Sequence, residues 1–347
     1  MYCKIMADHA VDGFFDGDIF IYRGGRAPQH ITHARIDKSV DEIEEGAFRY
    51  CEYLEQVDTH DGIKRVGKNA FCYCKSLRRI NLKSVVEIED YAFYYFGNLE
   101  SVEFGNRLET IVNCAFGHCA SLKTPLRLPS IVTIGHSAFI DCTYLTTIEL
   151  SERLETIEVS AFKCCYDLQR IVIPLKRDLF EFDDDVSDLQ HYSQFDECFQ
   201  LTTVDLVGGV HKTVASLHME SWRTEMIAEI NRINQVLPGT CPFVEKTDAI
   251  REWMDSVIDK MDHYKAEHHR YVKEGITILE LALWKARLGE KEDNYVDSSE
   301  GKAKNANVDA VTESARKEKR ITCGADIVFK NILPFLMFYE GCLVDRE

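Results

Sequence analysis

With 347 residues, 45% of them hydrophobic and 29% charged, the chain is long enough to bury a sizeable core. It carries 41 Lys and Arg against 58 Asp and Glu, a formal net charge of −17. We therefore expect no nucleic-acid partner, because sequence-independent binding needs Lys and Arg to displace counterions from phosphates.

The N-terminal residues contain no basic segment followed by a long apolar run, so we expect no signal peptide. No run of about 18 uncharged apolar residues occurs, so we expect no membrane span. The 13 cysteines are an odd number in a chain without an export signal, which favours reduced thiols. These features predict a cytoplasmic protein. A nuclear protein is the alternative, suggested only by the basic run ARKEKR at residues 315–320.

Residues 1–35 are expected to form an N-terminal cap, in which IFIYRGG is a strand that ends in a Gly-Gly turn. They precede an array of repeats whose first member would otherwise expose its interior. A polar terminal unit is expected wherever such an array ends.

The dipeptide Ala-Phe recurs at nearly constant intervals from residue 47 to residue 162. Each copy opens the same frame, F-x-x-C-x-x-L-x-x-I-x-L, and a seventh copy follows after a longer interval. The phenylalanines of the seven copies are Phe48, Phe71, Phe93, Phe116, Phe139, Phe162 and Phe195. Phe96 replaces the cysteine of the third copy, and the fourth copy has one extra residue before Leu126. The longer last interval holds an acidic insertion near residues 177–190.

A period of about 23 residues is too short for an independently folded unit and suits one coil of a solenoid. The L-x-x-I-x-L part alternates like a strand, with Ile and the last Leu pointing inward. The A-F-x-x-C part is expected to be a compact turn or short helix that places Phe inside the coil. Residues 36–210 are therefore predicted to form a repeat solenoid of the α/β class, with about seven coils.

Residues 211–289 are predicted to be helical. A first amphipathic helix has apolar residues at three- and four-residue steps over 222–237 and ends at a Pro-Gly pair. A second helix is expected to start near Thr247, a candidate N-cap, and to run to about Leu288. Gly275 is the point at which this helix could be interrupted.

Residues 290–320 are charged and lack periodicity, which predicts a flexible linker. Residues 321–347 are apolar again and are interrupted by Pro334. Because this tail also contains charged residues, we expect it to dock on another surface rather than to anchor in a membrane.

The repeats resemble the BspA-type leucine-rich-repeat family, whose signature is I-x-x-I-x-x-x-A-F-x-x-C-x-x-L-x-x-I-x-L. The resemblance covers residues 36–206 and all seven copies. It implies a right-handed coil with a parallel sheet on one face, used for adhesion and protein recognition rather than catalysis. The flanking blocks, among them DGFFDGDIFIYRGG and ITCGADIVFKNILPF, are similar to uncharacterised leucine-rich-repeat proteins of microalgae, a likeness that implies no activity.

Six cysteines share one position of the repeat, namely Cys51, Cys74, Cys119, Cys142, Cys165 and Cys198. A redox or metal ladder would need accessible thiolates or C-x-x-C spacing, which the sequence lacks. We favour a column of buried thiols that hydrogen-bond to backbone carbonyls at the turns. We predict no metal site and no cofactor.

The residue between the inward Ile and Leu points outward in every coil and is acidic in four of the seven coils. Together with the residue before the Ile, it defines a strand face, the kind of surface along which solenoids commonly bind partners. The candidate partner-binding residues are Asp58, Arg79, Asn81, Glu103, Arg127, Glu149, Arg170 and Asp205. A surface for a basic protein and an ordinary solvated polar face both agree with this pattern.

The sequence favours a non-catalytic scaffold that binds a protein along the strand face. An adhesion or glycan-binding surface protein is the alternative, although the strand face carries no aromatic residue. The third hypothesis is an enzyme that uses His263, Glu267 and His268 of the C-terminal helices. No P-loop, GxSxG, HExxH or Rossmann fingerprint supports it, and the oligomeric state stays open.

Overall fold

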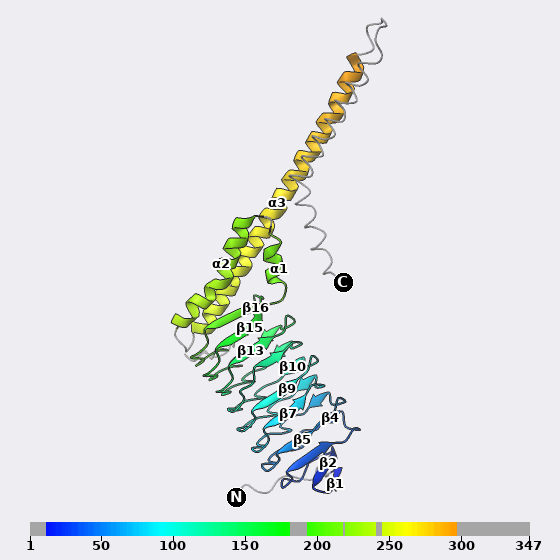
Figure 1. The fold of residues 1–347 in the computed structure, drawn as a ribbon, viewed down its shortest axis with the longest axis vertical. Coiled ribbons are helices and arrows are strands. Elements are labelled where there is room, and N and C mark those ends of the chain that lie inside the picture. Colours follow the sequence, from blue (N-terminus) through cyan, green and yellow to red (C-terminus); the bar gives the residue numbers. More distant parts are fainter. Residues whose placement is uncertain (1–11, 181–192, 218, 241–244, 297–347) are drawn as a thin grey trace, which may run out of the picture. The chain divides into compact units, whose positions relative to one another are not determined.

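The computed structural model describes residues 12–180, 193–217, 219–240 and 245–296, and the side chains of these residues up to 286 except that of residue 245 (Figure 1). The described strands all lie before residue 208, and the helices follow them. The predicted fold class, a repeat solenoid followed by helices, is confirmed.

Each coil contributes two short parallel strands rather than the single one expected. The first belongs to a six-stranded, in-register sheet whose strands are two residues long. These strands are β4 (Glu42–Ile43), β6 (Arg65–Val66), β8 (Glu87–Ile88), β10 (Thr110–Ile111), β12 (Thr133–Ile134) and β14 (Thr156–Ile157). Their buried Ile or Val is the apolar residue that precedes each Ala-Phe pair.

The second strand of each coil lies on the strand face, where the residues between the buried ones point outward. Its members are β3 (His33–Ile36), β5 (Gln56–Asp58), β7 (Arg79–Leu82), β9 (Ser101–Phe104), β11 (Leu126–Leu128), β13 (Thr147–Leu150), β15 (Arg170–Pro174) and β16 (Thr203–Val207). The hydrogen-bonded ladder is broken between β5 and β7 and again between β9 and β11. The second break lies beside the extra residue that precedes Leu126.

A column of phenylalanine rings fills the centre of the coils. All seven repeat phenylalanines are fully buried, and neighbouring rings stack nearly parallel with centroids 4.9–5.7 Å apart. The amide of Phe116 donates to the carbonyl of Ala138 in the next coil at 2.8 Å, and the same bond recurs from coil to coil. Phe162 and Phe195 remain stacked at 5.7 Å although the acidic insertion separates them in the sequence. The ring spacing is therefore kept across the acidic insertion, whose residues 181–192 lie outside the described part.

The Ala-Phe segment is a turn, not a short helix. Two columns of residues there have left-handed φ, one two positions before the Phe and one two positions after it. In the first coil these positions are Gly46 (φ 64°) and Tyr50 (φ 63°). The two left-handed residues prevent helical hydrogen bonding and direct the backbone amides toward the next coil.

The N-terminal end is closed by β1 (Asp12–Asp16), which pairs antiparallel with β2 (Ile19–Gly24). Strand β2 continues the parallel order into β3, and Tyr22 extends the ring column to Phe48 at 5.0 Å. The predicted strand of the N-terminal segment is therefore present.

Three helices follow the strands: α1 (Val210–Ala215), α2 (Glu220–Val236) and α3 (Glu245–Val296). Helix α3 runs without a break through Gly275 and continues into the segment expected to be a linker. The rest of that segment and the tail 321–347 lie outside the described residues. The chain divides into two compact units, and residues 227–258 belong to the unit of the solenoid.

Side chains of this helical part occupy hydrogen-bonding positions on the last coil. The hydroxyl of Thr247 accepts a hydrogen bond from the Phe195 amide at 3.2 Å. In the other coils the equivalent Phe amide donates to a backbone carbonyl of the next coil. Asn234 accepts the Val204 amide at 2.8 Å, and the buried Lys246 donates to the Leu201 carbonyl at 2.5 Å. Thr247 therefore terminates the solenoid instead of capping α3 as expected.

The repeat cysteines form the buried column that the sequence favoured. The thiol of Cys142 donates to the Phe116 carbonyl of the preceding coil at 3.3 Å, and Cys74, Cys119, Cys165 and Cys198 make the same contact at 3.0–3.2 Å. Burial raises the pKa of each of these five thiols well above its ordinary value of 9.0 and raises that of Cys51 to about 12. The thiols therefore stay protonated and act as hydrogen-bond donors.

We predict that Thr247→Val destabilises the protein by about 1–3 kcal/mol, because it leaves the buried Phe195 amide without an acceptor. Thr224→Val is the matched control, since the Thr224 hydroxyl bonds only within an exposed turn of α2. Urea unfolding followed by circular dichroism measures both. Equal stability of the two variants would show that the Thr247 hydroxyl does not stabilise the end of the solenoid.

We predict that the free energy of unfolding falls as the pH rises above about 9, by up to about 1.4 kcal/mol per pH unit for each buried thiol. Each buried thiol has a higher pKa in the folded chain than in the unfolded chain. As the pH rises, the unfolded chain therefore loses these protons first. The stability that is present below the unfolded pKa is lost in this range. Cys142→Ala should flatten this dependence. Leu145→Ala removes buried apolar atoms from the same coil but no thiol. It should lower the stability and keep the slope of stability against pH. Parallel slopes in urea titrations of both variants would contradict the prediction.

Candidate binding surfaces

The strand face brings the eight predicted residues together in rows. They lie on β5, β7, β9, β11, β13, β15 and β16, and each alternates with a buried residue of the same strand. The parallel register places Asn81 beside Glu103 and Arg127 beside Glu149. These residues therefore share one face, and their binding of a partner stays a prediction.

The acidic character expected for this face is neutralised within the face itself. Asp58 pairs with Arg35 at 3.4 Å, and Glu103 pairs with Lys83 at 2.7 Å. Glu149 lies between two cations, Arg127 at 3.1 Å and Arg170 at 3.4 Å, and Arg170 also holds Asp205 at 2.7 Å. Sequence reasoning named Arg127 and Arg170 on this face but did not predict that they pair with these carboxylates. It missed Arg35 and Lys83.

These pairs set the local electrostatics of the face. A hydrogen bond from Lys83 and its charge lower the pKa of Glu103, which keeps the carboxylate ionised. Because the groups are largely exposed, the pairs contribute little to stability and instead hold a fixed alternation of charges.

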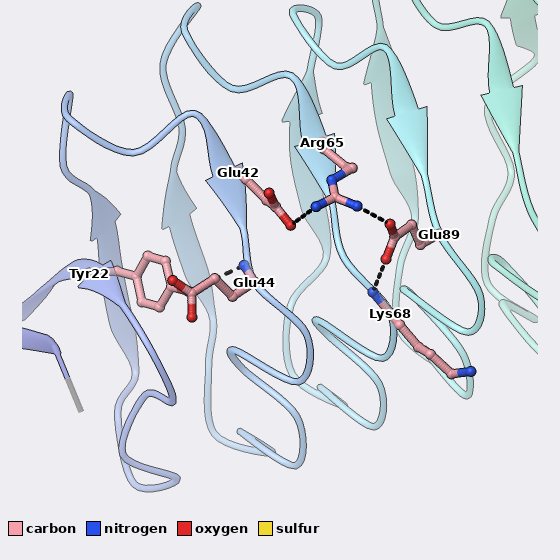
Figure 2. Close-up of polar contacts among 6 residues, drawn as sticks. All are labelled: Tyr22, Glu42, Glu44, Arg65, Lys68 and Glu89. Carbon is pink, nitrogen blue, oxygen red and sulfur yellow. Dashed lines mark hydrogen bonds and ion pairs between the residues drawn. The ribbon is translucent and has the colours of Figure 1, made fainter. Parts of the chain in front are cut away.

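The six-stranded sheet carries a second polar network on the opposite set of strands (Figure 2). Arg65 on β6 bridges Glu42 on β4 and Glu89 just beyond β8. Glu89 also accepts the Lys68 amide at 2.9 Å, and the Glu44 amide donates to the Tyr22 hydroxyl at 3.3 Å. A shallow open depression here is lined by Asp41, Glu42, Lys64, Arg65, Val86 and Glu87. Two ion pairs, Lys64–Asp41 and Arg65–Glu42, already occupy most of its charged groups.

A third feature was missed by the sequence reasoning: a tyrosine ladder formed by Tyr50, Tyr73, Tyr95 and His118. These rings stack in series with centroids 5.2, 5.1 and 4.3 Å apart. All four residues have left-handed φ between 56° and 63°, a strained conformation for a bulky side chain. The available signal was the repeated F-x-Y of the first three copies.

Stacking covers ring faces within the ladder. Each inner ring has neighbours on both sides, and the Arg49 guanidinium lies 4.9 Å from the Tyr50 ring centroid. At the other end, Asp141 accepts from His118 at 3.0 Å. Tyr50 and Tyr95 are 37% and 42% exposed, so the ladder is an accessible aromatic surface.

The enzyme hypothesis rested on His263, Glu267 and His268 of α3. Glu267, proposed as their partner, is paired with Arg270 at 2.6 Å. Within the described ranges, no group of three or more His, Cys, Asp and Glu side chains could hold a metal ion. None of the helices in the described part is both long and apolar enough to traverse a bilayer.

A family model described as BspA type leucine rich repeat region matches six copies, over residues 27–125 and 87–231. No curated protein matches.

Among solved structures, a leucine rich repeat protein of T. pallidum is 22% identical, with a TM-score of 0.43, and the alignment covers 62% of this chain and 97% of that one. A leucine rich cell surface protein of Faecalibacterium prausnitzii A2-165 is 25% identical, with a TM-score of 0.41 and coverage of 58% and 54%. The pneumococcal vaccine antigen PcpA is 18% identical, with a TM-score of 0.31 and coverage of 51% of each chain. The repeat frame, the stacked coils and the match across residues 27–231 agree: the chain belongs to the BspA type leucine-rich-repeat family.

Proposed function

We propose that this protein is a non-catalytic scaffold that binds a protein partner along the strand face. The observation that carries the proposal is the rows of charged side chains, in register within β7–β9 and within β11–β13, on strands whose other side is packed into the core. Such an array is held rigid before binding, which limits the entropy lost on association.

The partner is expected to carry a complementary alternation of charges. A generally basic protein, the partner suggested by the sequence, would meet Arg79, Arg127 and Arg170 as well as the carboxylates. Charge patterns of this kind contribute mainly to specificity and association rate.

The tyrosine ladder is a second candidate surface for the same function. Tyrosine is enriched in the cores of protein interfaces because it adds contact area at low cost in side-chain entropy. Two variants separate the surfaces. Lys83→Glu with Glu103→Lys inverts one ion pair but keeps it formed, and Tyr73→Ala with Tyr95→Ala removes the ladder centre.

We predict that a partner recovered from native extract by affinity purification and mass spectrometry loses at least tenfold in affinity for the charge-swapped variant. The ladder variant, with circular dichroism to verify its fold, should bind like the wild type. The reverse result would assign binding to the ladder. Unchanged affinity in both variants would show that neither surface binds the partner.

The alternative is an adhesion or glycan-binding protein of the cell surface. Sugar rings bind to the open faces of aromatic side chains, whereas the ladder faces are occupied by one another. The strand face has no aromatic residue among the eight candidates. Cell fractionation and binding to immobilised glycans test this alternative. The enzyme hypothesis lacks a comparable structural support.

We propose a cytoplasmic location. The nine cysteines of the described residues are free, which agrees with a reducing compartment. The formal charge of −17 supports a partner other than nucleic acid. The likeness of the flanking blocks to microalgal proteins stays a prediction.

A further inference from the structure

The second half of α3 exposes an apolar segment to solvent, which is unfavourable for a helix without a partner. Residues 276–284 read ITILELALW, so apolar side chains occur on every side of the helix. A helix that is hydrophobic all round is normally buried. Here Ile278, Leu281, Leu283 and Trp284 are 57–64% exposed.

The part of α3 that precedes this segment is packed normally. Trp222 stacks on Tyr264 with centroids 5.1 Å apart and contacts Tyr271 at 6.0 Å. Tyr264 also donates to the Glu225 carboxylate. From residue 273 to residue 286, every described side chain is exposed or half-exposed. The packing on α3 therefore stops shortly before the most apolar part of the helix.

The chain itself contains a segment of matching chemistry. Residues 321–340 include the apolar run ILPFLMFY and lie outside the described residues. The intervening residues 297–320 would span up to about 80 Å when extended. Leu281 lies only about 22 Å from Val296 along the helix. The tail therefore reaches the apolar segment without difficulty.

We propose that residues 321–340 bind the exposed apolar segment of α3 at residues 276–284. A segment tethered to its own receptor has an effective concentration in the millimolar range, which favours it over a second copy of the chain at micromolar concentration. The docking is independent of the strand face and of the tyrosine ladder.

Hydrogen exchange of the full chain, followed by mass spectrometry, tests the proposal from the helix side. Leu281→Gln with Trp284→Gln removes two exposed apolar side chains, so the solenoid should keep its stability. Exchange in peptides from residues 325–340 should accelerate at least tenfold in this variant. The control is Ile227→Gln, which replaces an apolar residue of α2 that is 52% exposed and should leave the tail unchanged.

The reciprocal variant tests it from the tail side. Phe335→Ser with Phe338→Ser should accelerate exchange in residues 276–284, and protection in the wild type should not change on dilution. Identical exchange in wild type and variants would overturn the proposal. Protection that weakens on dilution, together with a dimer in light scattering, would overturn it in favour of a second copy.

Discussion

The hydrogen bond from each repeat phenylalanine to the next coil is the contact on which the rest of the solenoid depends. It joins the Phe116 amide to the Ala138 carbonyl and recurs with nearly constant length. This bond fixes the coil spacing at a value that suits both parallel strands and stacked rings. Two left-handed positions in each of the first six turns aim the amides along the stack. An insertion is tolerated only where it leaves this spacing intact, as the 5.7 Å stack across the acidic insertion shows.

A stack built from such bonds has unsatisfied groups at its ends. At the N-terminal end the antiparallel strand β1 covers β2, and an aromatic residue, Tyr22, takes the place of a further Phe. At the C-terminal end three side chains, Asn234, Lys246 and Thr247, substitute for the backbone of a further coil. Desolvation lowers the pKa of Lys246, and the Leu201 carbonyl gives the buried ammonium group a hydrogen-bond partner. This explains why residues 227–258 form one compact unit with the solenoid.

The regular spacing also organises the surface. On the strand face it sets carboxylates beside cations, so the face presents a fixed charge pattern with little net charge. At the turns it brings Tyr50, Tyr73 and Tyr95 into contact, and mutual stacking offsets part of the strain of their left-handed φ. Outside the solenoid no repeat constrains α3, and its apolar segment is left exposed.

The regular period of the Ala-Phe frame by itself determined the solenoid, the inward phenylalanines and the buried thiols, because each is a consequence of which residue types recur at one position. It also placed Asp58, Glu103, Glu149 and Asp205 on one face, since outward positions follow from strand alternation. Only the tertiary structure decided that these carboxylates are paired, because their cations come from neighbouring coils and are distant in the sequence. For the same reason, only the tertiary structure showed the second sheet and the role of Thr247. These features depend on contacts between coils, which a pattern read along one chain does not contain.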